Sequence, residues 1–226
     1  MRETIMSDGP EQDDWRRAVV TVGGGRGFVV EIELNRYVVT AAHCLPQLPP
    51  EAPAEIEDLM YAKLLGPLGA EPTVWAECVF VDPVADLAVL GSPDNQELWE
   101  EAEAYAALVD NAVPLPIGRL TFVPQHFTRP DGTVIDGPPV AESAASLLSL
   151  DRRWFTCQVT SLGRALWIKD AVEPIQGGMS GSPIVAPDGT AIGVACLSAG
   201  PDNLPHHEGG PNPVLATRLP GWMLQQ

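Results

Sequence analysis

Residues 175–185 read Ile-Gln-Gly-Gly-Met-Ser-Gly-Ser-Pro-Ile-Val, and the interpretation of the whole chain starts from this stretch. Two glycines precede Ser180, a third follows it, and Pro183 then leads into an apolar run. Glycine allows positive φ and close approach of the backbone to a ligand, so the pattern predicts a tight turn that displays one hydroxyl. The N–H groups of Gly178 and Ser180 are expected to point at one oxygen beside Ser180 Oγ. Because a serine hydroxyl alone is a weak nucleophile, this hypothesis requires a histidine and a carboxylate upstream.

A histidine follows a pair of predicted strands early in the chain. Residues 28–34 carry apolar side chains at every second position, which predicts a strand with one buried face. We expect a turn at Asn35 and Arg36 and a returning strand at residues 37–40, which places His43 of Thr-Ala-Ala-His-Cys just after a strand. The other histidines lie in loop-like stretches without metal-ligand spacing, namely His126, His206 and His207.

A carboxylate follows at the start of another predicted strand. Asp86 directly precedes Leu-Ala-Val-Leu, and Asp82 stands nearby as the competing candidate. An aspartate in this setting is often only a capping or turn residue. The place of Asp86 immediately before the apolar run favours it as the partner of His43.

Composition favours a globular, all-β protein. The chain has 226 residues, of which 45% are apolar, so it can bury a full core. Its 21 glycines and 23 prolines predict many turns and irregular connections. Thirty acidic residues against thirteen basic ones give a formal charge of −17, which argues against nucleic acid and membrane surfaces as partners.

The predicted organisation has a tail and two halves. Residues 1–14 are expected to form a disordered acidic tail, residues 15–112 a first half with His43 and Asp86, and residues 113–226 a second half with Ser180. The remaining expectations are a strand at 15–22, a hairpin turn at Gly23–Gly27, a surface excursion at 45–71, a helical insertion at 95–109, short strands from 120 onward, a loop at 200–213 and a short terminal helix near Trp222.

In this order, Thr-Ala-Ala-His43-Cys, Asp86-Leu-Ala-Val-Leu and Gly-Gly-Met-Ser180-Gly-Ser-Pro resemble the three signatures of the trypsin-like (chymotrypsin-fold) serine peptidases. The resemblance spans roughly residues 15–222 and is closest to bacterial domains of the HtrA and glutamyl-endopeptidase type. It implies two six-stranded antiparallel β-barrels with the site in the cleft between them. It also implies a catalytic triad of His43 as general base, Asp86 as its orienter and Ser180 as nucleophile, with an oxyanion hole from the amides of Gly178 and Ser180. No metal or cofactor is implied.

Two departures from the family pattern concern regulation and the cysteines. Digestive members carry an aspartate before the nucleophile that pairs with a newly cut N-terminus, but this chain has Met179 there, so that activation switch is not expected. The family's usual disulfides lack their partner cysteines here. We therefore expect Cys44, Cys78, Cys157 and Cys196 to be buried thiols, as in a reducing compartment, although an even number leaves another pairing open. Cys196 stands where the family has a serine behind the aspartate, so its thiol is expected to touch Asp86.

By the same resemblance, the substrate pocket would be built from residues on both sides of the nucleophile. Pro174 falls at its base, where trypsin has an aspartate, which argues against cleavage after Arg or Lys unless Glu173 or Asp170 supplies a charge. A small or apolar side chain before the scissile bond is the preferred expectation. The full predicted set is Pro174, Gln176, Gly177, Cys196, Leu197 and Ser198.

The sequence thus predicts a serine endopeptidase, located in the cytoplasm, with a restricted protein or peptide substrate and room for a protein activator. Two alternatives stay open. One is a catalytically silent pseudopeptidase that acts as a protein-binding module, and the other is a hydrolase of esters or other acyl groups, because the same triad serves acyl transfer in general.

Overall fold

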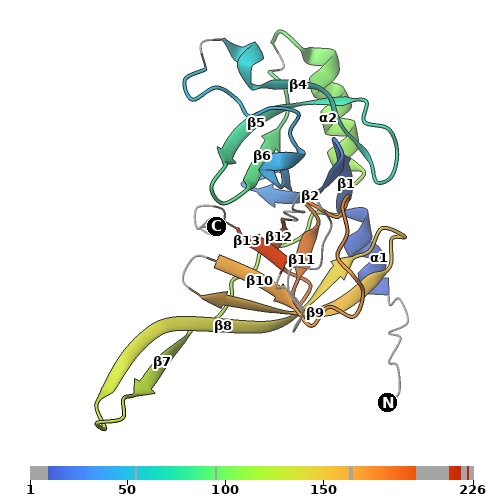
Figure 1. Ribbon diagram of the computed structural model, residues 1–226. Helices are drawn as coiled ribbons and strands as arrows, with labels where there is room; N and C mark the ends of the chain where they lie inside the picture. The colour runs from blue at the N-terminus through green and yellow to red at the C-terminus, as the bar shows by residue number, and fades with distance from the viewer. Residues whose placement is uncertain are drawn as a thin grey trace.

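The computed structural model describes residues 10–53, 55–94, 96–162, 165–196, 214–219 and 223. Figure 1 shows two β-barrels stacked one above the other, with the strands between residues 19 and 91 in the upper one and the strands from residue 123 onward in the lower one. The expected fold of two closed, six-stranded antiparallel barrels is confirmed. The loop at 200–213 lies outside the described residues, and of the predicted terminal helix near Trp222 only Met223 is described.

The first barrel closes in the order β1-β2-β3-β6-β5-β4. Antiparallel pairing of β1 with β4 completes the ring, so this half has no free strand edge. Its strands are β1 Val19–Val22, β2 Gly25–Ile32, β3 Asn35–Thr40, β4 Met60–Pro67, β5 Val74–Asp82 and β6 Leu87–Gly91.

The second barrel closes through a single pairing between β11 and β8, Val185 opposite Ser146. Its six strands run in the order β8-β9-β10-β13-β12-β11, and β7 adds a seventh strand along β8. The bounds are β7 Val123–Thr128, β8 Val134–Leu148, β9 Trp154–Leu162, β10 Ala165–Lys169, β11 Pro183–Val185, β12 Ala191–Ala195 and β13 Val214–Arg218. Strand β7 and the first half of β8 form a long hairpin arm that leaves the barrel (Figure 1).

Two α-helices among the described residues lie outside the barrels. Helix α2, Trp99–Asp110, confirms the expected helical insertion and packs against β5. Helix α1, Pro10–Arg17, is a correction, because residues 10–14 were expected in a disordered tail and residues 15–18 in a strand. Asp13 pairs with Arg16 three residues later, and Trp15 packs edge-on against Trp154 of the second barrel, so tertiary contact stabilises this helix. No helix among the described residues is long and apolar enough to cross a membrane.

The hairpin that leads to His43 has a different turn from the expected one. The turn residues are Glu33 and Leu34, both with positive φ, and Ile32 pairs with Asn35. Leu34, expected inside the strand, is 92% exposed. A two-residue hairpin turn with two positive-φ residues matches the twist of the flanking strands, and here pairing with β3 overrides the cost of the missing glycine.

Candidate active site

His43 and Asp86 lie together at the edge of the first barrel. His43 sits on a short 3₁₀ helix, η1 Ala42–Cys44, immediately after β3, and Asp86 ends the turn between β5 and β6. The ring Nδ1 of His43 lies 2.7 Å from Asp86 Oδ2, and the backbone N–H of His43 donates to Asp86 Oδ1 at 2.9 Å. One carboxylate therefore fixes both the position and the ring orientation of the histidine.

The neighbouring Asp82 has a different role. Its Oδ1 accepts the backbone N–H groups of Val84 at 3.0 Å and Ala85 at 2.9 Å, so it closes the turn after β5. Asp86 adopts a positive φ of 54° at the end of that turn. The two carboxylates thus divide between turn formation and contact with the histidine, as the order of the sequence motif suggested.

The pair alters the pKa of both groups. The hydrogen bond with Asp86 raises the pKa of His43 above its ordinary value, with partial burial acting against it. Burial raises the pKa of Asp86, but hydrogen bonds from the His43 ring and backbone outweigh it, and the pKa of the carboxyl is lowered. Asp86 is therefore ionised at neutral pH, and its charge favours the protonated imidazole.

Ser180 lies on the glycine-rich turn before β11. Gly178 and Gly181, which flank it, have φ of 88° and 82°. Among the described residues no group accepts a hydrogen bond from the N–H of Gly178 or of Ser180, whereas the next amide, that of Gly181, donates to the Ala195 carbonyl. The turn therefore leaves two backbone donors available beside one serine, which is the arrangement an oxyanion requires.

The junction between the barrels brings the serine turn to the histidine side. A Cβ added to Gly25 of the first barrel would lie 2.6 Å from Cys44 Sγ and 2.8 Å from the Ser180 carbonyl oxygen. Cys44, which follows His43 in the chain, and Ser180 therefore both lie against Gly25. Between His43 and Ser180 themselves, both described, no hydrogen bond is formed. Ser180 is 6% exposed. Catalytic hydrogen bonds are often long in unliganded enzymes and tighten with substrate.

Arg26 is a further residue at this junction that the sequence patterns did not single out. It is 5% exposed, although it belongs to β2 of the first barrel. Its guanidinium donates to the carbonyls of Leu148 at 2.7 Å and Ser149 at 2.9 Å in the second barrel, and its N–H donates to the Ser180 carbonyl at 2.8 Å. The only sequence signal was an arginine between glycines at the start of an apolar strand.

The other predicted site residues fall into three groups. Pro174, Gln176 and Gly177 are exposed on the loop before Ser180. Cys196 is buried, and its thiol lies 3.4 Å from the Asp86 carbonyl oxygen, so it backs the aspartate as expected. Leu197 and Ser198 lie outside the described residues.

All four cysteines are free and buried, as predicted. Burial raises the pKa of each thiol, namely Cys44, Cys78, Cys157 and Cys196. In the described ranges no three His, Cys, Asp or Glu side chains gather in a way that would hold a metal ion.

The chain folds into two antiparallel six-stranded barrels, with a His–Asp pair on the first and a serine turn from the second at their junction. This arrangement defines the chymotrypsin-like class of folds. The chain belongs to the trypsin-like peptidase domain family, whose model matches residues 25–194.

Two similar solved structures have low sequence identity. One is a chain from work on the intrinsically disordered Sesbania mosaic virus VPg protein, with 13% identity, a TM-score of 0.45, and coverage of 89% of this chain and 85% of that one. The other is an inactive form of the Rv3671c protease, with 17% identity, a TM-score of 0.44, and coverage of 95% and 90%. No curated protein matches the chain.

Proposed function

We propose that the protein is a serine endopeptidase that cleaves peptide bonds through an acyl-enzyme formed on Ser180. The observation that carries the proposal is the doubly hydrogen-bonded His43–Asp86 pair at a junction that also holds a serine turn. Two amides of that turn donate to no group in the part of the chain that the structure describes. Membership of the trypsin-like peptidase family supports a peptidase.

Each group has a defined task in this mechanism. Neutral His43 takes the Ser180 proton as the hydroxyl attacks the carbonyl carbon, and later returns it to the leaving amine. Asp86 holds the ring with Nδ1 protonated and stabilises the imidazolium. The amides of Gly178 and Ser180 stabilise the oxyanion, and a water activated by His43 then hydrolyses the acyl-enzyme.

For the substrate, we propose a restricted protein or peptide with a small or apolar side chain before the scissile bond. Pro174 at the expected pocket base carries no charge, and Glu173 is paired with Arg153 at 3.3 Å, which leaves this carboxylate less suited to binding a basic side chain. Four buried free thiols fit a reducing compartment, so we assign the protein to the cytoplasm.

For activation, we propose that the serine loop is held without a new N-terminus. Met179 is fully buried in the second barrel's core, and its Sδ accepts the Gln176 N–H at 3.4 Å. Apolar burial takes the place of the ion pair that orders this loop in digestive relatives. A protein activator would then act by bringing Ser180 and His43 into hydrogen-bonding distance.

One observation favours the second candidate, a catalytically silent protein-binding module. Ser180 is nearly buried and makes no hydrogen bond to His43, although both residues are described. A module of this kind would keep the barrels and lose the nucleophile's activation.

The deciding experiment is labelling of the intact protein with a fluorophosphonate, with wild type beside Ser180→Ala and His43→Ala and the adduct located by mass spectrometry. We expect an adduct on Ser180 of the wild type alone. Absence of an adduct, with and without candidate partner proteins, would exclude the peptidase. Cleavage of peptide libraries as well as esters then distinguishes an endopeptidase from an esterase.

A further inference from the structure

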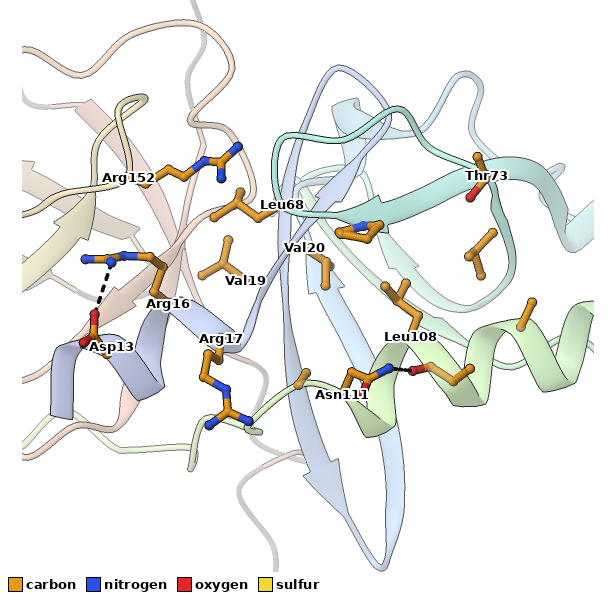
Figure 2. A pocket seen from close by; sticks show the side chains of 15 residues that line it. Asp13, Arg16, Arg17, Val19, Val20, Leu68, Thr73, Leu108, Asn111 and Arg152 are labelled. Carbon is orange, nitrogen blue, oxygen red and sulfur yellow. Dashed lines mark hydrogen bonds and ion pairs between the residues drawn. The ribbon is translucent and has the colours of Figure 1, made fainter. Parts of the chain in front are cut away.

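A cavity of about 710 Å³ lies away from His43, Asp86 and Ser180. It is open to solvent on one side and is lined by helix α1, strand β1, the connection between β4 and β5, helix α2 and one residue of the second barrel, Arg152 (Figure 2). Cavities that bind small organic molecules in proteins span roughly 300 to 1,000 Å³, so this one has the size of a ligand site.

One wall of the cavity is apolar. It consists of aliphatic side chains from the first barrel, from α2 and from a residue just after that helix, which are Val19, Val20, Pro67, Leu68, Val74, Ala104, Ala107, Leu108 and Ala112. Figure 2 shows Leu68 and Val20 between the arginines on one side and Leu108 on the other. A wall of this kind favours the hydrocarbon part of a ligand over a hydrated inorganic ion.

The opposite rim is cationic. Arg16, Arg17 and Arg152 line it, which places three of the thirteen basic residues of an otherwise strongly acidic chain around one cavity. Asp13 neutralises Arg16 at 3.1 Å, and Asp14 lies 3.5 Å from Arg17.

Arg152 differs from the other two arginines. No carboxylate pairs with it among the described residues, because the adjacent Asp151 is bound by Arg153. Its guanidinium packs on Gly69 of the first barrel, where an added Cβ would clash with it. The side chain thus extends from the second barrel across to the cavity and leaves one positive charge there without a partner.

We propose that this cavity binds a small organic anion with an apolar body and a carboxylate head group. Arg152 would receive the head group as a charge-assisted hydrogen-bond donor, and the aliphatic wall would take the body. Because the wall belongs to the first barrel and Arg152 to the second, the bound ligand contacts both barrels. A ligand that binds only the folded protein raises its melting temperature.

The test uses decanoate as the probe and isothermal titration calorimetry on the full-length protein. We expect saturable binding of decanoate, at one site per chain and below its micellar range, with a rise in melting temperature. Acetate, which lacks the body, and decyltrimethylammonium, which reverses the charge, are expected to bind at least about tenfold more weakly. Equal binding of decanoate and the cation would overturn the proposal.

Matched variants locate the site. Arg152→Gln removes the unpaired charge and is expected to weaken decanoate binding about tenfold. Arg129→Gln removes an exposed arginine that does not line the cavity and is expected to leave binding unchanged. Ala107→Leu fills the cavity from an exposed position of α2 and is expected to weaken binding similarly, whereas Ala106→Leu on the same helix faces a different hollow. Wild-type affinity in both Arg152→Gln and Ala107→Leu would refute the site, and melting curves verify that each variant is folded.

Discussion

The backbone N–H of Arg26, on the first barrel, donates a 2.8 Å hydrogen bond to the carbonyl oxygen of Ser180, on the second. The same arginine places its guanidinium on the carbonyls of Leu148 and Ser149, so a single residue joins the two barrels at the candidate nucleophile. A buried cation of this kind costs desolvation free energy, which lowers the pKa of Arg26, and its hydrogen bonds offset that cost.

We therefore expect Arg26→Met to lower both stability and the reactivity of Ser180. Two charge-assisted hydrogen bonds are lost, although the Ser149 carbonyl still accepts the Arg152 N–H at 3.1 Å. The desolvation cost is relieved at the same time, so the free energy of unfolding should fall by about 1–3 kcal/mol. Urea unfolding and fluorophosphonate labelling measure the two effects. The exposed Arg129→Met is the control, and an unchanged labelling rate in a folded Arg26→Met would show that the junction does not position the serine.

The pH dependence of labelling should follow His43. The imidazole must be neutral to accept the Ser180 proton, and its pKa is raised by Asp86, so the rate should increase with pH and level off with a midpoint above about 6.5. Asp86→Asn removes the cause of the shift and should lower both the midpoint and, by roughly 10² to 10⁴, the plateau rate.

Asp82→Asn is the matched control for that experiment. Its Oδ1 only accepts backbone N–H groups in the turn, and an amide oxygen can do the same. We expect a near wild-type pH profile. A large loss in Asp82→Asn, with Asp86→Asn unaffected, would mean that the carboxylate roles are assigned the wrong way round.

Gly181→Ala should destabilise the fold far more than Gly177→Ala. Gly181 has φ of 82°, and a Cβ there would clash with the Arg26 carbonyl, so both strain and overlap apply, and we expect a loss of about 2 kcal/mol or more. Around Gly177, apart from its two chain neighbours, no atom of the described residues lies within 4 Å of the added Cβ. Equal unfolding midpoints for the two variants in urea would contradict this description of the serine turn.

Met179 offers a test of how the serine loop is ordered. Met179→Leu preserves apolar volume and should cost less than about 1.5 kcal/mol. Met179→Asp introduces the carboxylate of the digestive enzymes into an apolar core without a partner and should cost about 3 kcal/mol or more at neutral pH. Thermal unfolding near pH 7 compares the two, and a wild-type melting temperature for the aspartate variant would reveal a partner for it.

The thiols should be unreactive in the native protein. All four are buried, and burial raises their pKa values, that of Cys157 to about 12, so little thiolate is present at pH 8. Titration with a disulfide reagent should count no rapidly reacting thiol in buffer and four in denaturant. Rapid reaction in buffer would indicate local opening of the barrels.

Some of the fold could not be predicted from local patterns. The residues of strand β4 were expected to belong to a surface excursion. Lys63, with φ of 51°, lies within a register shift that interrupts the alternation of inward and outward side chains, so the strand pattern is not visible in the sequence. The strand is specified by its pairing with β1 and β5. Strand β8 was not among the strands expected from the sequence, and it contains Pro138 and Pro139. They lie where its pairing with β7 shifts register, next to Pro124, and an irregular ladder tolerates the missing N–H groups.

What the sequence by itself determined is local. The glycines around Ser180 dictate a turn with available amides, His43 follows a strand, and Asp86 precedes one, because these features depend on backbone conformation a few residues either way. Only the tertiary structure decided that Asp82 closes the turn after β5 and that Arg26 joins the barrels at the serine. The role of Arg26 depends on hydrogen bonds between residues far apart in the chain. These residues come within hydrogen-bonding distance only when the barrels close and pack together.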